Sequence, residues 1–183
     1  MELLDVIANR RAYRSLDPVE INEPMIRDLA AAASLSASCF NNQPWRFVSV
    51  IDPAVLRELS GVMSKNNDWT RAASMVVAVV SRRDLDCLVK GREYFLFDSG
   101  MATAFLILRA TEMGLVAHPI AGFDDVKAKE ILRIPADMTL ITLVIVGRHA
   151  SKRGPLLTDK QAEAEKQRPT RKPLEEIMRI NHF

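Results

Sequence analysis

The sequence predicts an α+β fold in which helices surround a mixed or antiparallel sheet. A continuous β-branched run at Met75–Ser81 indicates a buried strand. A mostly apolar segment from Tyr94 to Met113, with no proline, indicates a long central helix that is buried on most faces. The other helical and strand patterns alternate without a regular strand–helix–strand series, which favours the α+β class.

The first third of the chain predicts two helices, a loop and a strand. Apolar residues at helical spacing in 3–8 predict a short helix that ends at Arg10-Arg11. Glu23-Pro24 opens a second helix that reaches about Ser34, because proline is tolerated in the first helical turn. Residues 36–44 lack periodicity and predict a loop, and alternation over 46–52 predicts a strand.

The remaining core elements are marked by capping residues and glycines. Asp52 is expected to cap a helix from Pro53, and Gly114 is expected to end the central helix. Three further elements follow: a short strand at Val116–Ile120, an amphipathic helix starting at Asp124, and a last core strand at Leu140–Val146 that Gly147 closes.

The C-terminal segment has a different character from the rest of the chain. Residues 151–183 contain eight Lys and Arg against five Asp and Glu, and too few apolar residues to fold alone. We therefore divide the 183 residues into a core at 1–150 and an arm at 151–183. We expect the arm to pack on another surface, with a second subunit as the candidate.

Charge and cysteine content exclude several classes of protein. A net charge of +2 is too small to indicate nucleic acid, and the arm has no aromatic residue before Phe183. Cys39 and Cys87 lie far apart, and the three histidines show no ligand spacing, so we expect neither a metal site nor a disulfide. These features favour a reducing cytoplasm.

A membrane location is not expected either. The most apolar stretch, Phe95–Ala121, is interrupted by Asp98, Arg109 and Glu112, so a buried core helix explains it better than a membrane span. The first residues lack the basic-then-apolar order of a secretory signal.

Four short segments are candidates for chemistry, and each also has a simple structural explanation. Residues 10–14 hold three arginines, which suit phosphate but also suit a solvated helix end. Residues 38–45 crowd amides and a hydroxyl, which suit a planar ring or a turn. Residues 114–123 offer small residues for close backbone approach or a strand-end turn. Residues 168–177 place basic side chains before a helix start or in a solvated tail.

Together and in this order, the four segments resemble motifs of the nitroreductase family of FMN-dependent oxidoreductases. That family opens with Arg-Arg-Ser-x-Arg and continues with Ala-Pro-Ser-x-x-Asn-x-Gln-Pro-Trp. A Gly-Leu-Gly…Gly segment follows, and Arg-Lys-Pro-Leu-Glu-Glu often closes the chain. The corresponding stretches here are Arg10–Arg14, Ser36–Trp45, Gly114–Gly122 and Arg171–Glu176.

The resemblance implies a three-layer sandwich, a homodimer with an exchanged C-terminal arm, and FMN at the dimer interface. It implies that Arg10, Arg11 and Arg14 hold the FMN phosphate, ribityl and pyrimidine side, with help from Arg171. The loop from the partner subunit and the segment after the central helix complete the FMN site. The implied cofactor-binding residues are Arg10, Arg11, Ala12, Arg14, Ala37, Ser38, Cys39, Asn41, Pro119, Ile120, Ala121, Gly122 and Arg171.

The resemblance also implies the reaction. NAD(P)H would deliver hydride to the flavin, and a small electron-poor acceptor such as a nitroaromatic or quinone would then be reduced, without a catalytic side chain. Phe40, Trp69 and Tyr94 are candidates for the substrate pocket, although packing explains Trp69 and Tyr94 better.

This sequence departs from the family pattern at three positions. Ala12 replaces the usual serine, Ala37 replaces the usual proline, and Phe40 stands where a small residue is common. We hypothesise that Phe40 narrows the pocket and selects flat aromatic acceptors. Two alternatives remain at this point: other chemistry on the same fold, such as reductive dehalogenation or flavin cleavage, and flavin binding without catalysis.

Overall fold

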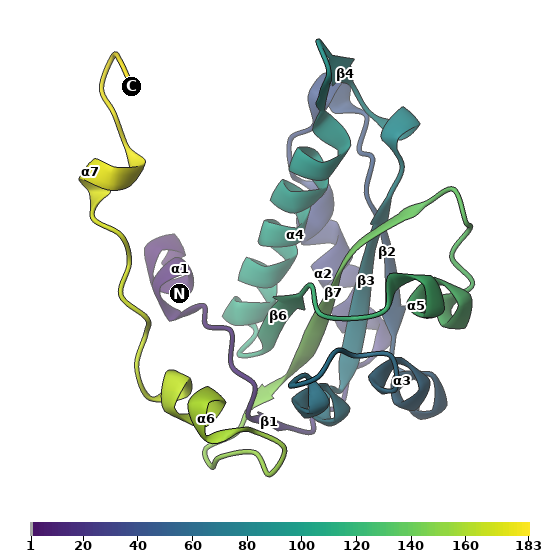
Figure 1. Ribbon diagram of the computed structural model, residues 1–183, viewed down its shortest axis with the longest axis vertical. Helices are drawn as coiled ribbons and strands as arrows, with labels where there is room; N and C mark the ends of the chain where they lie inside the picture. Colours follow the sequence, from purple (N-terminus) through teal and green to yellow (C-terminus); the bar gives the residue numbers. More distant parts are fainter. Residues whose placement is uncertain (1) are drawn as a thin grey trace.

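Five strands form one antiparallel sheet at the centre of the structure, a computed structural model that describes residues 2–183 (Figure 1). The strand order is β1-β7-β3-β2, and β6 also pairs with β7. The sheet is therefore antiparallel rather than mixed. Its strands are β1 (Leu16–Asp17), β2 (Arg46–Val50), β3 (Met75–Ser81), β6 (Val116–Ile120) and β7 (Thr139–His149).

Strand β3 is buried along its whole length because both faces of the sheet are covered. Successive side chains of a strand point to opposite faces. Val76, Ala78 and Val80 accordingly join one apolar cluster, whereas Val77 and Val79 join another. This explains why β3 has a continuous apolar run instead of an alternating pattern.

Helices form the two outer layers (Figure 1). The face that carries Val77 is covered by α2 (Glu23–Ser34) and α4 (Tyr94–Glu112), through residues such as Leu29 and Leu106. The opposite face is covered by α3 (Pro53–Ser60), α5 (Asp125–Leu132) and the 3-10 helix η2 (Asp68–Ala72). The predicted sandwich of helices around a sheet is confirmed.

Three predicted helix boundaries are also confirmed. Asp52 accepts hydrogen bonds from the backbone N–H groups that open α3, and Asp124 accepts one at the start of α5. Gly114 follows the end of α4 with a φ of +75°, a conformation that glycine adopts without steric cost. The remaining short elements are α1 (Leu3–Asn9), η1 (Cys39–Asn41), η3 (Arg83–Leu85), β4 (Leu88–Val89) and β5 (Arg92–Glu93).

The prediction that Gly147 closes the last strand is wrong. Strand β7 continues to His149, because its last two residues pair with β1: Leu16 lies opposite His149 and Asp17 opposite Arg148. Gly147 is instead needed for packing, since a Cβ there would meet the Leu16 side chain at 3.3 Å.

The first half of the arm lies against its own chain, and packing of the arm on a partner subunit stays a prediction. Leu157 is only 5% exposed and joins the apolar cluster on the face of the sheet that carries Val76. It precedes α6 (Asp159–Lys166), which begins with a capping box between Thr158 and Gln161. Residues 151–168 therefore pack on their own chain.

The second half of the arm extends away from the body in Figure 1. Residues 169–183 are all exposed, including those of α7 (Leu174–Ile177), which follows Pro173 as predicted. Exchange of this segment with a partner subunit stays a prediction. No helix among residues 2–183 is long and apolar enough to cross a membrane.

Candidate functional site

Arginines from the two ends of the chain meet beside α1. Arg168 donates hydrogen bonds to the carbonyl oxygens of Ala8 and Arg10, the latter at 2.7 Å. Arg11 donates in the other direction, to the carbonyl oxygens of Glu165 at 3.0 Å and Gln167 at 2.9 Å. These bonds hold the arm against residues 8–11 and bring its basic residues to the first predicted segment.

The resulting arginine cluster comprises Arg10, Arg11, Arg168 and Arg171. Burial lowers the pKa of Arg10, and the charges of Arg168, Arg171 and Arg11 lower it further. Across residues 2–183 the ion pairs involve other side chains, and none of these four arginines is paired with a carboxylate. The cluster thus carries positive charge that the described protein does not neutralise, which is the environment that a phosphate group requires.

Arg14 lies close to this cluster but is positioned differently. The carboxylate of Glu165 accepts hydrogen bonds from the backbone N–H of Arg14 and from the backbone and hydroxyl of Ser15, the last at 2.7 Å. Burial opposes ionisation of Glu165, but these hydrogen bonds outweigh it and lower its pKa. The guanidinium of Arg14 remains outside this network and lies 6.0 Å from the Trp69 ring centre.

Trp69 proves to be a packing residue. Its side chain is only 1% exposed and stacks on His118, with 4.8 Å between the ring centres. A side chain this buried does not line a pocket open to solvent in the described chain, which favours the packing role of Trp69 over a place in the substrate pocket. His118 in turn bonds through Nδ1 to the carbonyl oxygen of Tyr13 at 3.1 Å.

The third predicted segment runs from β6 into the following turn. Pro119 and Ala121 are exposed, Ile120 is buried, and Gly122 is partly buried. The Nδ2 of Asn67 donates a hydrogen bond to the Gly122 carbonyl at 2.9 Å. A Cβ at Gly122 would lie 2.7 Å from that nitrogen, so the glycine permits the close approach of Asn67.

The predicted loop at Ser36–Pro44 lies at the other end of α4. The backbone N–H of Cys39 donates to Asp98 near the start of α4 at 2.7 Å. Three non-glycine residues of the loop have positive φ: Phe40, Asn41 and Gln43. The backbone of Gln43 also donates to the Ser38 hydroxyl at 2.9 Å, so the strained conformation is internally supported.

Phe40 points away from its own chain. Its side chain is 91% exposed, whereas Tyr94 is partly buried. The backbone N–H of Tyr94 donates to the carbonyl of Cys87, and Cys87 is bonded to Cys39, the residue before Phe40. Phe40 and Tyr94 therefore share one end of the molecule.

The family model named "Nitroreductase family" matches residues 7–68 and 62–148, which is most of the chain. The chain belongs to the nitroreductase family. Protein DrgA of Synechocystis is 28% identical over 177 residues, covering 81% of this chain and 84% of its own length. The oxygen-insensitive NADPH nitroreductase of Helicobacter pylori is 24% identical, covering 62% of this chain and 70% of its own length.

The fold of this nitroreductase-family chain also resembles solved structures. A crystal structure of an oxidoreductase containing FMN superposes with a TM-score of 0.82 at 27% identity, covering 97% of this chain and 91% of that one. The α+β fold with an antiparallel sheet and a long helix is therefore a property that the chain shares with structures of its family.

Within the described chain, the site residues predicted from the family resemblance lie in two separate groups. Residues 10–14 and the arginine cluster lie beside the C-terminal end of α4, whereas the loop that carries Ser38 and Phe40 lies beside its N-terminal end (Figure 1). A helix of 19 residues is about 28 Å long. The two groups therefore do not form one site within a single chain.

Three residues that support these segments were not among the predicted site residues. Arg168 completes the arginine cluster, Glu165 fixes the backbone of residues 14–15, and Asn67 bonds to Gly122. Arg168 lies at the start of the fourth predicted segment, whose basic residues are its sequence signal. No local sequence signal identifies Glu165 or Asn67, because their roles depend on contacts distant in sequence.

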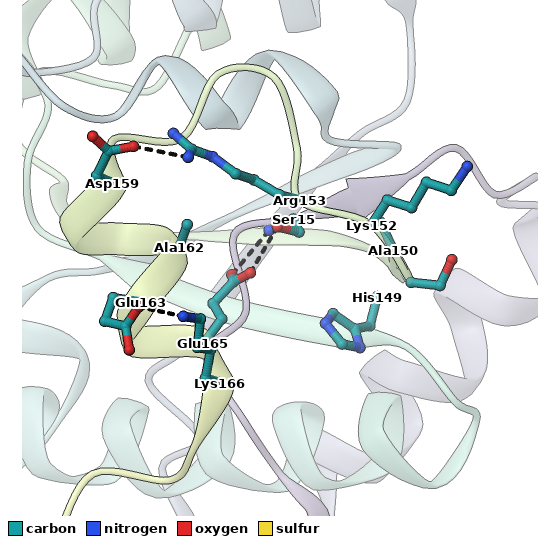
Figure 2. Close-up of a pocket in the computed structure, with 11 residues that line it drawn as sticks. Ser15, His149, Ala150, Lys152, Arg153, Asp159, Ala162, Glu163, Glu165 and Lys166 are labelled. Carbon is teal, nitrogen blue, oxygen red and sulfur yellow. Dashed lines mark hydrogen bonds and ion pairs between the residues drawn. The ribbon is translucent and has the colours of Figure 1, made fainter.

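A polar cavity of about 430 Å³ lies between α6 and the segment after β7 (Figure 2). Four of its charged side chains form two ion pairs: Arg153 with Asp159 at 2.8 Å and Lys166 with Glu163 at 2.6 Å. Glu165 points toward Ser15 in the same view, as the hydrogen bonds require. The lining holds three basic and three acidic side chains, so the cavity lacks the net positive charge of the arginine cluster.

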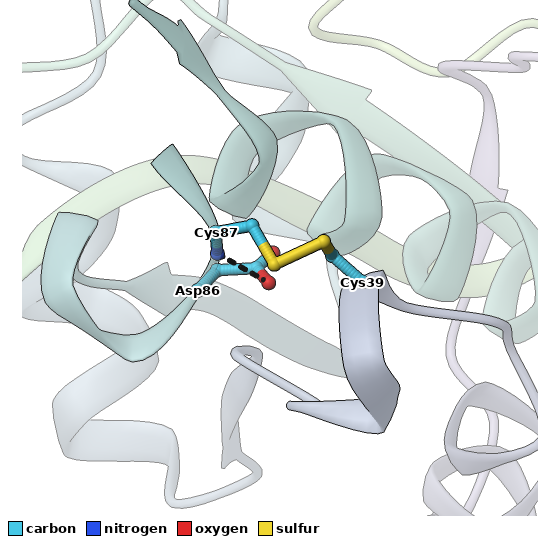
Figure 3. Close-up of side chains that lie close together, drawn as sticks. All are labelled: Cys39, Asp86 and Cys87. Atoms are coloured by element: carbon cyan, nitrogen blue, oxygen red, sulfur yellow. Dashed lines mark hydrogen bonds between the residues drawn. A yellow bond between two sulfur atoms is a disulfide. The ribbon is translucent and has the colours of Figure 1, made fainter. Parts of the chain in front are cut away.

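The expectation of no disulfide is wrong. Cys39 and Cys87 form a disulfide with 6.1 Å between their Cα atoms (Figure 3). The pairing was not visible in the sequence, because 48 residues separate the cysteines and only the fold brings the loop beside the segment that precedes β4. The expectation of a reducing cytoplasm rested on unpaired cysteines, so the disulfide removes its support.

Proposed function

We propose that this chain is an FMN-dependent oxidoreductase that transfers hydride from NAD(P)H, by way of flavin N5, to an electron-poor organic acceptor of the nitroaromatic or quinone type. The observation that carries the proposal is the arginine cluster, in which residues from both ends of the chain place unneutralised charge at one point. The Helicobacter relative is named as an NADPH nitroreductase, which supports the choice of electron donor.

The chain's own residues fit a phosphate-bearing cofactor. Arg10 and Arg171 would bind the phosphate, while Arg11 and Arg168 spend hydrogen bonds on carbonyls and keep the arm in place. Burial lowers the pKa of Arg10 most, and a bound anion would offset the repulsion from neighbouring arginines that lowers it further. Arg14, with no carboxylate partner among the described ion pairs, would direct positive charge toward the ring system.

The segment after β6 would contribute backbone groups. Ala121 is exposed, and Gly122 is held by Asn67, so backbone N–H groups of this turn could face a planar ring without side chains in the way. FMN supplies hydride acceptance and donation when bound, so the protein needs no catalytic acid or base. The role of the chain is to bind the cofactor and shape the surface where donor and acceptor alternate.

A homodimer would bring the two separated groups together. Within one chain they lie at opposite ends of α4, so the loop of a second subunit is needed to place Ala37, Ser38, Cys39 and Asn41 near the arginine cluster. Exposed apolar side chains support association: Leu3, Leu35 and Phe105 line one surface hollow, and large contiguous apolar patches usually mark interaction sites. The exposed apolar side chains include Leu3, Leu4, Leu35, Phe97, Phe105, Leu174, Ile177 and Ile180.

The visible absorption spectrum of the purified protein tests the proposal, before and after anaerobic addition of NADH or NADPH. We expect flavin bands that bleach with the donor and return when an acceptor is added. A protein that takes up no FMN on incubation contradicts the proposal. If the protein binds flavin but neither NADH nor NADPH reduces it, the cofactor assignment stands and the proposed oxidoreductase activity is contradicted.

A further inference from the structure

Two cysteines and two aspartates gather at the N-terminal end of α4. Cys39 comes from η1, Asp86 and Cys87 follow η3, and Asp98 lies in the second turn of α4. The Sγ atoms of the two cysteines and a carboxylate oxygen of Asp86 all lie within 4.8 Å of one another (Figure 3). We call Cys39, Asp86, Cys87 and Asp98 the Cys–Asp cluster.

One carboxylate oxygen of Asp86 accepts hydrogen bonds, and the other has none. Its Oδ1 accepts hydrogen bonds from the backbone N–H of Cys87 at 2.8 Å and from Nδ2 of Asn42 at 3.2 Å. Its Oδ2 is buried and has no hydrogen-bond partner among residues 2–183. A buried carboxylate oxygen without a partner is costly, and a cation is the partner that it most readily accepts.

Asp98 adds a second acid at the same place. Its side chain is only 1% exposed, and Oδ2 accepts the Cys39 N–H at 2.7 Å. Its carboxyl group therefore lies beside the Cys39 backbone, where it adds negative charge that a divalent cation would neutralise.

We propose that reduction of the Cys39–Cys87 disulfide turns the Cys–Asp cluster into a Zn²⁺ site, with the two thiolates and Asp86 as ligands. Two thiolates and a carboxylate form a donor set that suits zinc. Water takes the fourth position of the tetrahedron. The expectation of no metal rested on ligand spacing in the sequence, and this site arises only from tertiary contacts.

The disulfide state and the zinc-bound state of the cluster exclude each other, because the two sulfurs of a disulfide are not thiolates and do not bind zinc as thiolates do. An external dithiol gives two electrons and two protons to the disulfide; the S–S bond breaks, two thiols form, and the dithiol itself becomes a disulfide. Zn²⁺ then replaces the two thiol protons, which pass to solvent.

The backbone spacing accommodates this change. Zn–S bonds of about 2.3 Å place two thiolates about 3.8 Å apart on a tetrahedral ion. Cysteines with Cα atoms 6.1 Å apart reach that separation by rotating their side chains. Either state therefore ties the loop that carries Phe40 to the segment before β4, and the inference does not depend on flavin binding.

The experiment compares untagged, metal-free protein in its oxidised and reduced forms. Each form is titrated with Zn²⁺ against a chromophoric chelator and separately with Co²⁺, and thiols are counted with a thiol-reactive dye. We expect one ion per reduced chain and none per oxidised chain. Thiolate-to-cobalt charge-transfer absorption should appear, and zinc should protect the two thiols. Equal zinc binding by both forms, or binding that leaves the thiols unprotected, would overturn the proposal.

A pair of variants separates the ligand from general effects of charge. Asp86→Asn keeps both cysteines and is expected to lower the zinc affinity of the reduced protein at least about tenfold. Asp84→Asn removes a nearby exposed carboxylate that pairs with Arg82, and its affinity should equal that of the unmodified protein. Circular dichroism of each reduced protein establishes that the fold is retained. An unchanged zinc affinity in folded Asp86→Asn would falsify the assignment of Asp86.

Discussion

Asn67 is held between two groups that the sequence places far from each other. Its Nδ2 donates to the carbonyl oxygen of Gly122 at 2.9 Å, and its Oδ1 accepts from Nε1 of Trp69 at 3.2 Å. The backbone N–H of Ser64 donates to the same Gly122 carbonyl at 2.9 Å. The turn after β6 therefore has a fixed position against residues 64–69.

Gly122→Ala is expected to destabilise the protein by about 1–3 kcal/mol, because the new Cβ would meet Asn67 Nδ2 at 2.7 Å and Ser64 Cβ at 3.3 Å. Urea unfolding of four proteins checks this: the unmodified chain, each single variant and Gly122→Ala combined with Asn67→Ala. Removing the Asn67 amide should reduce the cost of the alanine. Equal costs in both backgrounds would show that Asn67 is not the group that collides.

Arg171→Ala is expected to weaken FMN binding about 10- to 100-fold, since a charge-assisted hydrogen bond contributes about 1.5–3 kcal/mol. Arg10→Ala should have an effect of similar size. Quenching of flavin fluorescence measures both dissociation constants at one fixed ionic strength.

The matched control is Arg27→Ala, which removes an exposed arginine that pairs with Glu23 on α2. It should leave FMN affinity unchanged. If Arg171→Ala and Arg27→Ala bind FMN equally well, the arginine cluster is not the phosphate site.

Phe40→Ala is expected to change the order in which the enzyme prefers its acceptors and to leave stability within about 0.5 kcal/mol. The side chain is 91% exposed in the chain, so its removal deletes little packing. Steady-state kcat/KM for a series of flat and bulky acceptors measures the preference. An unchanged ranking removes the idea that Phe40 selects flat aromatic compounds.

Most of the core could be predicted because local patterns decided it. Strand β3 was predicted at its observed bounds, since only burial on both faces explains an unbroken β-branched run. Asp52 and Asp124 marked helix starts correctly, because capping uses a side chain and backbone groups two or three residues away.

The failures concern contacts that are distant in sequence. Gly147 was expected to end β7, but pairing with β1 extends the strand past it. The Cys39–Cys87 disulfide and the meeting of Arg168 with Arg10 likewise depend on the completed fold. The sequence predicted the four segments of the site but not their arrangement. Neither periodicity nor spacing along the chain shows which segments meet in the folded chain and which remain at opposite ends of α4.

Ending the chain after Arg168 is expected to preserve the core but weaken dimer association at least about tenfold. Residues 169–183 are exposed in the described chain, and burial of even one side chain such as Ile177 or Ile180 on a partner contributes about 1.5–3 kcal/mol. Sedimentation velocity at several concentrations measures association, and circular dichroism checks the core. Identical association of the full and shortened chains would exclude a role for this segment in the dimer.

Acidification from pH 6.5 to pH 4 is expected to reduce the free energy of unfolding by about 3 kcal/mol through His118 alone. Burial lowers the pKa of His118 to about 4; the Tyr13 hydrogen bond raises it, and the charges of Arg14 and Arg10 lower it. In the unfolded chain the pKa returns to about 6.5, so between these values the unfolded state binds more protons. Stability is therefore complete above pH 6.5 and is lost as pH falls toward 4.

His118→Gln isolates this contribution from the carboxylates that also titrate in acid. Urea unfolding at pH 7 and pH 4.5, at one protein concentration, should show a smaller difference between the two conditions for the variant than for the unmodified chain. The variant loses the stack on Trp69, so it will be less stable at pH 7, and only the change with pH is compared. Equal changes in the two proteins would mean that His118 accepts a proton in the folded state without cost, contrary to its burial beside two arginines.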